Sequence, residues 1–357
     1  MSIRTKVIAF IVSILLLLIA GIVFIFDASY AEAYRVFGNQ YHFVRNQAIW
    51  AVLGLVAMVI TACIPVSILK RMALGIGVTT IVFLVLVFVP NIGLEVNGAM
   101  RWISISGYQF QPSEFAKLGL VLFGGYMLTT KKGMKFFFGL YGLAMILILL
   151  QPDLDTVIVI GSTMIAMLFV GGITWRSLAS MAIIAIITVP ALVMISPYRR
   201  ARVMTYLDAS ADPLGSSYHV RQVQLALGSG GLFGQGFGQS RAKYQFIPEA
   251  STDSIFAIVA EEVGFFGSSI VLFFLCLPGL LGYGIAKASS SMSDKIIATG
   301  ITTWFMTQTL LNLGAMTMII PLSGIPLPFL SYGGSSLLSV LLASGILIGI
   351  GIRAGRA

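Results

Sequence analysis

The chain has 357 residues, of which 58% are hydrophobic and only 10% are charged. Soluble domains are about 45–50% apolar and about 25% charged, so this composition, with a mean hydropathy of +0.97, excludes an ordinary soluble domain and indicates an integral membrane protein. The net charge of +9 is interpreted as basic loops that set membrane orientation, not as a surface for nucleic acid.

Apolar runs of roughly bilayer length recur along the chain, and helices are the structure that satisfies the backbone of such runs in lipid. The sequence therefore predicts an all-α, polytopic membrane protein with about ten transmembrane helices in one domain, residues 1–357. The first run begins like a signal peptide, but its length favours a retained helix. The predicted spans are 7–26, 44–64, 72–90, 113–130, 136–150, 156–171, 177–196, 252–286, 295–320 and 334–352.

Basic residues occupy every second loop between these spans, which predicts that those loops and both termini are cytoplasmic. The long connection 197–251, between spans seven and eight, is then extracellular. It nevertheless carries six basic residues: Arg199, Arg200, Arg202, Arg221, Arg241 and Lys243. An anionic ligand on the outer face would explain them, because arginine matches the geometry of phosphate oxygens. Contact with lipid headgroups is the alternative.

The stretch before and within span four carries a pair of ionisable residues. Pro112 suits the first turn of a helix, and Glu114 and Lys117 are spaced i, i+3, so they share a helix face. Lys117 lies inside the apolar run, where a charged side chain suggests a function and Glu114 is its predicted partner. A structural ion pair that locks the helices together is the alternative interpretation.

Three polar or glycine-rich stretches follow. Asp153 and Asp155 in "QPDLDTV" are typical of turn chemistry and helix capping. The glycine-rich stretch 226–246 lacks both nucleotide-binding patterns, so a flexible or re-entrant loop that lines a cavity is expected. The stretch "PLSGIPLPFLSYGGSS", 321–336, is either a rigid outer cap or one wall of a site.

Carboxylates gather in "PEASTDSIFAIVAEE", which leads into span eight. Asp253 is expected in the early turns of this helix, near the outer surface, where dipole complementarity alone would explain it. Glu261 lies about 12 Å deeper at 1.5 Å per residue. It and Glu262 are expected in the membrane as buried carboxyls whose role, structural or functional, stays open.

Taken together, these stretches resemble the SEDS family of shape, elongation, division and sporulation membrane proteins, which includes FtsW, RodA and SpoVE. The motifs that carry the resemblance run over essentially the whole chain in the family's order: "NGAMRWI", "QPSEFAKL", "QPDLDT", "YRRARV", "DPLGSSYH", "GSGGLFGQGFGQSRAKYQFIPEASTDSIFAIVAEEVGF" and "PLSGIPLPFLSYGGSS". The chain departs from the usual family pattern at Ser251, at Asp155 and at Ser217, Tyr218 and His219.

The resemblance implies a peptidoglycan glycosyltransferase of the bacterial cytoplasmic membrane, which polymerises lipid II at the outer face for division or elongation. It implies a class B penicillin-binding protein and other divisome or elongasome membrane proteins as partners, and a divalent cation, Mg²⁺ or Mn²⁺, as cofactor. The family's essential aspartate matches Asp253, the expected general base and a candidate metal ligand. The family's ion pair matches Glu114 and Lys117.

The expected reaction is an inverting glycosyl transfer with a pyrophosphate-lipid leaving group, which needs positive charge where negative charge builds. The candidate pyrophosphate-binding residues are Arg101, Arg199, Arg200, Arg221 and Lys243. Two other functions stay open. Ionisable residues in the membrane would also suit a lipid II flippase, and the chain could instead be a non-catalytic scaffold for the penicillin-binding protein.

Overall fold

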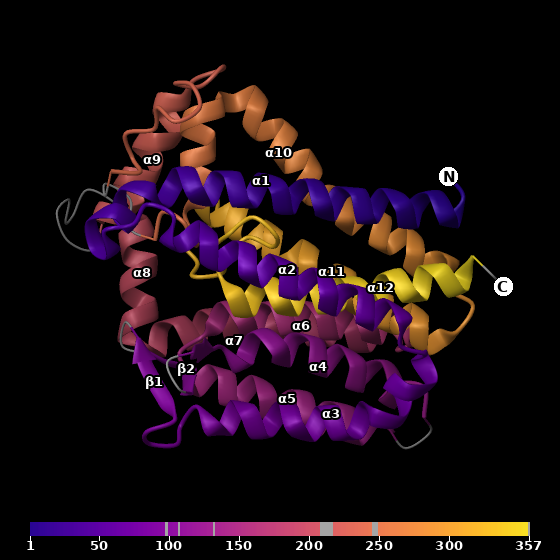
Figure 1. The fold of residues 1–357 in the computed structure, drawn as a ribbon. Helices are drawn as coiled ribbons and strands as arrows, with labels where there is room; N and C mark the ends of the chain where they lie inside the picture. Colours follow the sequence, from indigo (N-terminus) through magenta and orange to yellow (C-terminus); the bar gives the residue numbers. More distant parts are fainter. Residues whose placement is uncertain (97–98, 106–107, 131–132, 208–216, 245–248, 356–357) are drawn as a thin grey trace.

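The structure is a computed structural model that describes residues 1–96, 99–105, 108–130, 133–207, 217–244 and 249–355. Most of these residues form long helices that run roughly alongside one another (Figure 1). The helices are α1 Ile3–Phe37, α2 His42–Cys63, α3 Val66–Leu86, α4 Pro112–Met127, α5 Gly133–Leu150, α6 Leu154–Val170, α7 Trp175–Ile195, α8 Pro197–Leu207, α9 Tyr218–Gly230, α10 Ile255–Ala288, α11 Met292–Met316 and α12 Gly334–Ala354.

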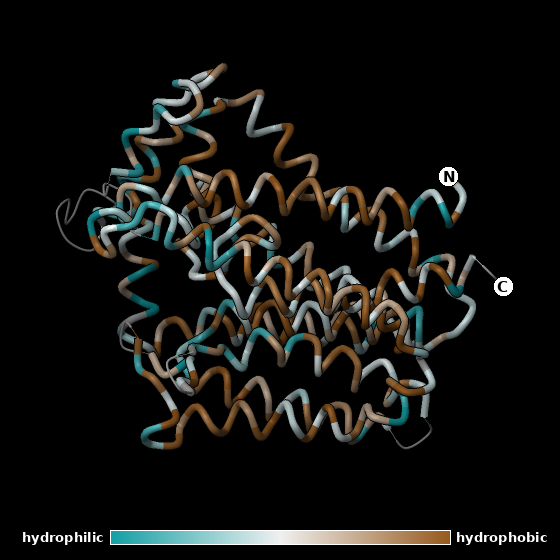
Figure 2. Tube along the Cα trace, in the orientation of Figure 1, coloured by the Kyte–Doolittle hydropathy of each residue, from teal (hydrophilic) through white to brown (hydrophobic). Residues whose placement is uncertain are grey.

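The helices confirm the predicted polytopic membrane architecture. Seven of those described are long and apolar enough to cross a membrane, namely α1, α2, α3, α5, α7, α10 and α12. Helices α4, α6 and α11 occupy the three remaining predicted spans. Both chain ends lie at one end of the bundle in Figure 1. Hydrophilic residues gather at the opposite end, around α8 and α9 (Figure 2), which we call the cavity end.

Two features of the cavity end were not predicted. A three-stranded antiparallel sheet, β1 Gly93–Val96, β2 Ala99–Ile105 and β3 Tyr108–Phe110, precedes α4 and adds a short β element to the otherwise all-α fold. The long connection 197–251 is not a simple loop, because it contains the helices α8 and α9. Residues 208–216 and 245–248 of this connection, including Pro248, lie outside the described part of the chain.

The core of the bundle is built around α11 and α12. Large apolar residues of α1, α2, α10, α11 and α12 form one buried cluster, which includes Trp304 and Leu341. A second cluster joins α4, α5 and α6 and includes Phe123, Phe137 and Tyr141. Helix α12 is the most enclosed of the candidate spans, with 78% of its apolar window buried. The middle of the bundle is therefore protein-packed, and the other helices shield it from lipid.

The glycine-rich stretch packs into a kink of α10, although a flexible or re-entrant loop was expected. Gly264 has φ 66°, a left-handed conformation that favours glycine. The amides of Gln235 and Gly236 donate to the carbonyls of Glu261 and Glu262, both over 3.0 Å. A Cβ on Gly264 would lie 2.2 Å from the backbone nitrogen of Gly234. The glycines therefore permit direct contact between two backbones, and this contact fixes the stretch.

Candidate active site

A cavity of about 620 Å³ opens at the cavity end of the bundle. Its walls come from β2, β3, α8, α9, the turn before α10 and the segment 322–336, which runs into the first turn of α12. The segment 321–336 thus forms one wall of the cavity, the second of the two predicted alternatives. Polar side chains dominate the lining: Arg101, Gln109, Gln111, Arg202, Thr205, His219, Glu249, Thr252, Asp253, Ser323, Ser335 and Ser336.

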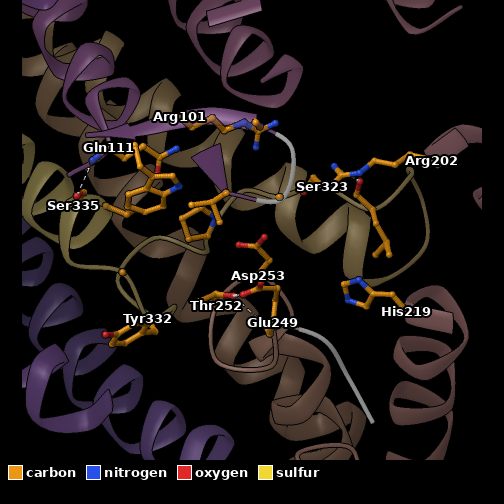
Figure 3. A pocket seen from close by; sticks show the side chains of 18 of the residues that line it. Arg101, Gln111, Arg202, His219, Glu249, Thr252, Asp253, Ser323, Tyr332 and Ser335 are labelled. Carbon is orange, nitrogen blue, oxygen red and sulfur yellow. Dashed lines mark hydrogen bonds between the residues drawn. The ribbon is translucent and has the colours of Figure 1, made fainter. Parts of the chain in front are cut away.

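Asp253 points into this cavity from the turn that precedes α10 (Figure 3). It lies just before the helix, which begins at Ile255, whereas the sequence placed it in the first turns. Two neighbours fix this turn. The side-chain Nδ2 of Asn312 donates to the carbonyl of Asp253 over 2.8 Å, and the Ser331 hydroxyl donates to the carbonyl of Thr252 over 2.6 Å. The carboxyl is therefore held by a rigid backbone.

The electrostatics around Asp253 favour the protonated form. Burial raises the pKa of the Asp253 carboxyl to about 7, and the charge of Glu249 acts in the same direction. Arg202 and Arg101 lower it, but not enough to offset burial. A carboxyl that titrates near neutral pH in a cavity is a candidate general base, because proton transfer is most efficient when the pKa is close to the working pH.

Arg202 is a cavity residue that the sequence did not single out as a candidate. It lies on α8 across from Asp253 (Figure 3). Its Nη1 lies 3.9 Å from Asp155 Oδ2, and the same carboxylate oxygen accepts from the amide of Gly324 over 3.2 Å. Asp155 therefore ties α8 to the 322–336 wall. Asp153, by contrast, caps α6 as expected, accepting from the amide of Thr156 over 3.1 Å.

The five predicted pyrophosphate residues occupy different places. Arg101 lines the cavity and donates from Nε to the carbonyl of Gln151 over 3.1 Å. Arg199 donates hydrogen bonds to the carbonyls of Leu192 on α7 and Leu149 on α5, over 3.3 and 3.2 Å. Its guanidinium is therefore bonded to the helix backbone. Like Arg199, the other three residues lie outside the cavity lining: Arg200, Arg221 and Lys243. Of the five, only Arg101 lines the same cavity as Asp253.

Lys243 lies in a buried cluster of charges instead. Its Nζ lies 2.9 Å from Asp27 Oδ1 and 3.1 Å from Glu262 Oε1, and its side chain is fully buried. Glu261 next to it accepts from the Ser240 hydroxyl and from the amide of Arg241. This cluster joins α1, α10 and the C-terminal part of the glycine-rich stretch. Glu261 and Glu262, whose role was open, therefore make structural contacts.

The predicted pair of Glu114 and Lys117 forms a buried ion pair, with 2.6 Å between Lys117 Nζ and Glu114 Oε1. Lys117 also donates to Gln308 Oε1 over 2.8 Å and lies 5.1 Å from the ring centroid of Trp304. Gln308 in turn donates to the carbonyl of Pro326 over 2.8 Å. Since Pro326 lines the cavity, the ion pair supports the cavity wall from beneath.

A second titratable residue faces the cavity from α9. His219 Nε2 lies 2.8 Å from the hydroxyl oxygen of Ser254, the residue after Asp253. Burial and the charge of Arg202 lower the pKa of His219 to about 4, so its ring is neutral at neutral pH. The neutral ring forms a hydrogen bond with Ser254. The positive charge of the described cavity lining therefore comes from its arginines.

The donors for a divalent cation are few. Among the residues described, there is no group of three or more histidine, cysteine, aspartate or glutamate side chains that could hold a metal ion. Mg²⁺, however, is usually bound by one or two carboxylates together with water and substrate phosphates. Asp253, which faces an open cavity, could supply one carboxylate ligand to a cation whose other ligands are water and substrate phosphates. The described residues do not supply a complete set of protein ligands.

A family model described as "Cell cycle protein", FTSW_RODA_SPOVE, matches residues 7–354. Stage V sporulation protein E of Bacillus subtilis is 36% identical over 344 residues, covering 94% of each chain. A probable peptidoglycan glycosyltransferase FtsW of Pseudoalteromonas translucida is 38% identical, covering 94% of this chain and 86% of the relative.

Solved structures share the fold. A chain from a structure described as "Structural coordination of polymerization and crosslinking by a peptidoglycan synthase complex" superposes with a TM-score of 0.78 at 28% identity, covering 96% of this chain and 97% of that one. The rod shape determining protein RodA of Thermus thermophilus gives a TM-score of 0.71 at 25% identity, covering 96% of each chain.

Proposed function

The chain belongs to the FtsW, RodA and SpoVE family of cell cycle proteins, and from this premise we propose that it is a glycosyltransferase that polymerises lipid II into glycan strands. The observation that carries the proposal is the Asp253 carboxyl, which faces a polar cavity and has a pKa of about 7. The cavity volume of about 620 Å³ lies within the usual range for ligand sites.

In the proposed reaction, the Asp253 carboxylate accepts the proton of the sugar hydroxyl that attacks. The hydroxyl oxygen bonds to the anomeric carbon of the donor from the face opposite the leaving group, so the configuration inverts. The bond from that carbon to the pyrophosphate oxygen breaks, and the pyrophosphate-lipid leaves with the electron pair. Asp253 then holds the proton until water removes it. A base with a pKa near neutrality suits both steps.

Positive charge is needed where the pyrophosphate departs. Arg101 and Arg202 are the guanidinium groups of the cavity lining among the residues described, and both act electrostatically on Asp253. We assign them to the leaving group. A Mg²⁺ or Mn²⁺ ion bound by Asp253 would neutralise charge on the phosphate oxygens. Lys243 and Arg199 lie outside the cavity lining, so the cavity offers no support for their predicted role.

The proposal includes orientation and partner. The cavity end faces the outside of the bacterial cytoplasmic membrane, since basic residues of the predicted cytoplasmic loops belong to the opposite end. A class B penicillin-binding protein crosslinks the product. The likeness to a chain of a peptidoglycan synthase complex supports this partner.

The decisive experiment incubates the purified protein with lipid II, with and without a class B penicillin-binding protein and Mg²⁺ or Mn²⁺, and resolves the products by size. Long glycan chains are expected. Their loss in Asp253→Ala, with the complex intact, excludes a scaffold, and Glu95→Gln on β1 is the control for removal of an exposed carboxylate at the same end. Movement of intact lipid II between leaflets without polymer would identify a flippase and overturn the proposal.

A further inference from the structure

A second cavity, of about 570 Å³, lies between α3 and α4, the neighbouring helices at the bottom of Figure 1. Only Arg71, Thr79 and Thr80 bring polar side chains to its described lining; the rest is apolar or glycine. Met72 and Phe83 on its rim are exposed, at 54% and 39%. In a membrane protein such exposed apolar residues face lipid, so this groove is open to the bilayer.

The groove and the polar cavity share a wall. Phe110, on β3, packs its ring against Phe83 and Phe115, with centroids 5.6 and 4.7 Å apart. Both of those rings line the groove. The residues on either side of Phe110, Gln109 and Gln111, line the polar cavity. The short strand β3 therefore separates the polar cavity from the apolar groove.

We propose that this groove binds the polyprenyl chain of the lipid-linked substrate while its sugars and pyrophosphate occupy the polar cavity. The inference rests on the proposed function. A substrate with a charged head and a long apolar tail must keep the head in the polar cavity and the tail in an apolar environment. The groove is an apolar space that opens to lipid directly beside the cavity, which makes it the continuation that such a molecule requires.

The groove contributes orientation more than affinity. Lipid tails are as apolar as the protein surface, so transfer of the chain from bilayer to groove gains packing contacts and no hydrophobic free energy. From Arg71 to Phe83 the groove is about 18 Å long at 1.5 Å per residue, against about 30 Å for the hydrocarbon core. It therefore holds only the isoprene units nearest the pyrophosphate, and the remainder of the chain extends into lipid.

Two exposed glycines on apolar helices offer a matched test. A Cβ on Gly75, in the groove, would meet no heavy atom within 4 Å, and the same holds for Gly139 on α5, outside the groove. Since a Cβ finds open space at both positions, Gly75→Leu places an apolar side chain in the groove, and Gly139→Leu makes the same change on another helix. Polymerisation is measured for both variants with full-length lipid II and with an analogue that has a short tail.

We expect Gly75→Leu to lower the rate with full-length lipid II by about threefold or more, a modest change because packing contacts alone are lost. With the short-tailed analogue, the difference from the parent protein should disappear. Gly139→Leu should match the parent protein with both substrates. A photoreactive undecaprenyl phosphate, labelled near the phosphate, should crosslink to α3 and α4 in the parent protein and less in Gly75→Leu.

Equal behaviour of the two leucine variants would overturn the inference, as would crosslinks spread evenly over the bundle. If Gly75→Leu instead displaces a co-purified phospholipid and leaves the dependence on tail length unchanged, the groove holds a structural lipid and the inference is wrong. Absence of polymer from the parent protein would contradict the proposed function itself, and the crosslinking result would still report on the groove.

Discussion

Asn312 donates one hydrogen bond to the carbonyl of Asp253 and another to the carbonyl of Ile325, each over 2.8 Å. A single buried amide on α11 thus joins the turn that carries the candidate base to the opposite wall of the cavity. Gln308, one helical turn earlier, bonds the carbonyl of Pro326. These two residues make α11 the support of the site.

Asn312→Leu removes both bonds and leaves two carbonyls without their donor. A buried polar group without a partner costs about 1–3 kcal/mol, and misplacement of the base should lower kcat by about tenfold while KM changes little. Thr309→Val, on the same buried part of α11, is the control. Steady-state polymerisation and thermal unfolding in detergent measure the two effects. A kcat equal to that of the control would show that Asn312 does not position Asp253.

The pKa of about 7 for Asp253 predicts that activity rises with pH through neutrality, since the base works when deprotonated. Asp253→Asn should lower the rate by at least about 100-fold. A pH–rate profile of the parent protein measures the apparent pKa. An acidic limb near pH 4, the usual range for aspartate, would contradict the raised value.

The same shift has a consequence for stability. A carboxyl whose pKa is raised on folding stabilises the protein below its unfolded pKa, and this contribution is lost as pH rises through the folded value of about 7. Asp253→Asn removes the cost of the buried charge. The variant should therefore unfold at a temperature at least about 2 °C higher than the parent protein at pH 8, roughly the shift for 1 kcal/mol. The gain should be smaller at pH 5, which lies nearer the unfolded pKa. A gain that is equal at both pH values would exclude ionisation as its cause.

Arg202→Gln should weaken inhibition of polymerisation by inorganic pyrophosphate, because the guanidinium faces the cavity beside Asp253. A charge-assisted hydrogen bond contributes about 1.5–3 kcal/mol, so the inhibition constant should rise by about tenfold or more. Arg200→Gln, two residues away and exposed outside the cavity lining, should leave it unchanged. Equal effects of the two substitutions would indicate a general contribution of surface charge.

Lys117→Met should destabilise the bundle by about 3–5 kcal/mol, since it leaves the Glu114 carboxylate buried and unpaired. Adding Glu114→Gln removes that charge and should restore much of the lost stability. Thermal unfolding of the single and double variants measures the coupling. A double variant no more stable than Lys117→Met would show that the ion pair is not the source of the loss.

Much of the fold follows from local sequence. Runs of apolar residues mark the long helices, and the i, i+3 spacing identified the ion pair of Glu114 and Lys117. The strands β1 to β3 were not predicted, because they are 3 to 7 residues long and show no sustained alternation of polar and apolar residues. Short polar helices such as α8 give no span signal, so the connection was expected to be a loop.

A site residue could be predicted when its own local sequence marks it. It could not be predicted when its role depends on residues that are distant in the sequence. Asp253 stood out as an acid beside an apolar run. Arg202 did not, because only the rotation of α8 decides which of its arginines faces the cavity. Asn312 is an uncharged side chain in an apolar run, and its role depends on a turn 59 residues earlier.

The charge cluster of Asp27, Lys243 and Glu262 has a consequence for biosynthesis. Asp27 lies on α1, and its ammonium partner follows 216 residues later. Chains fold from the N-terminus during synthesis at about 5–20 residues per second, so α1 waits for tens of seconds at the slower rate before this pair can form. Until then the Asp27 carboxyl, which is buried in the folded protein, lacks its ammonium partner, and α1 can take its final place only after the chain has been made as far as Lys243.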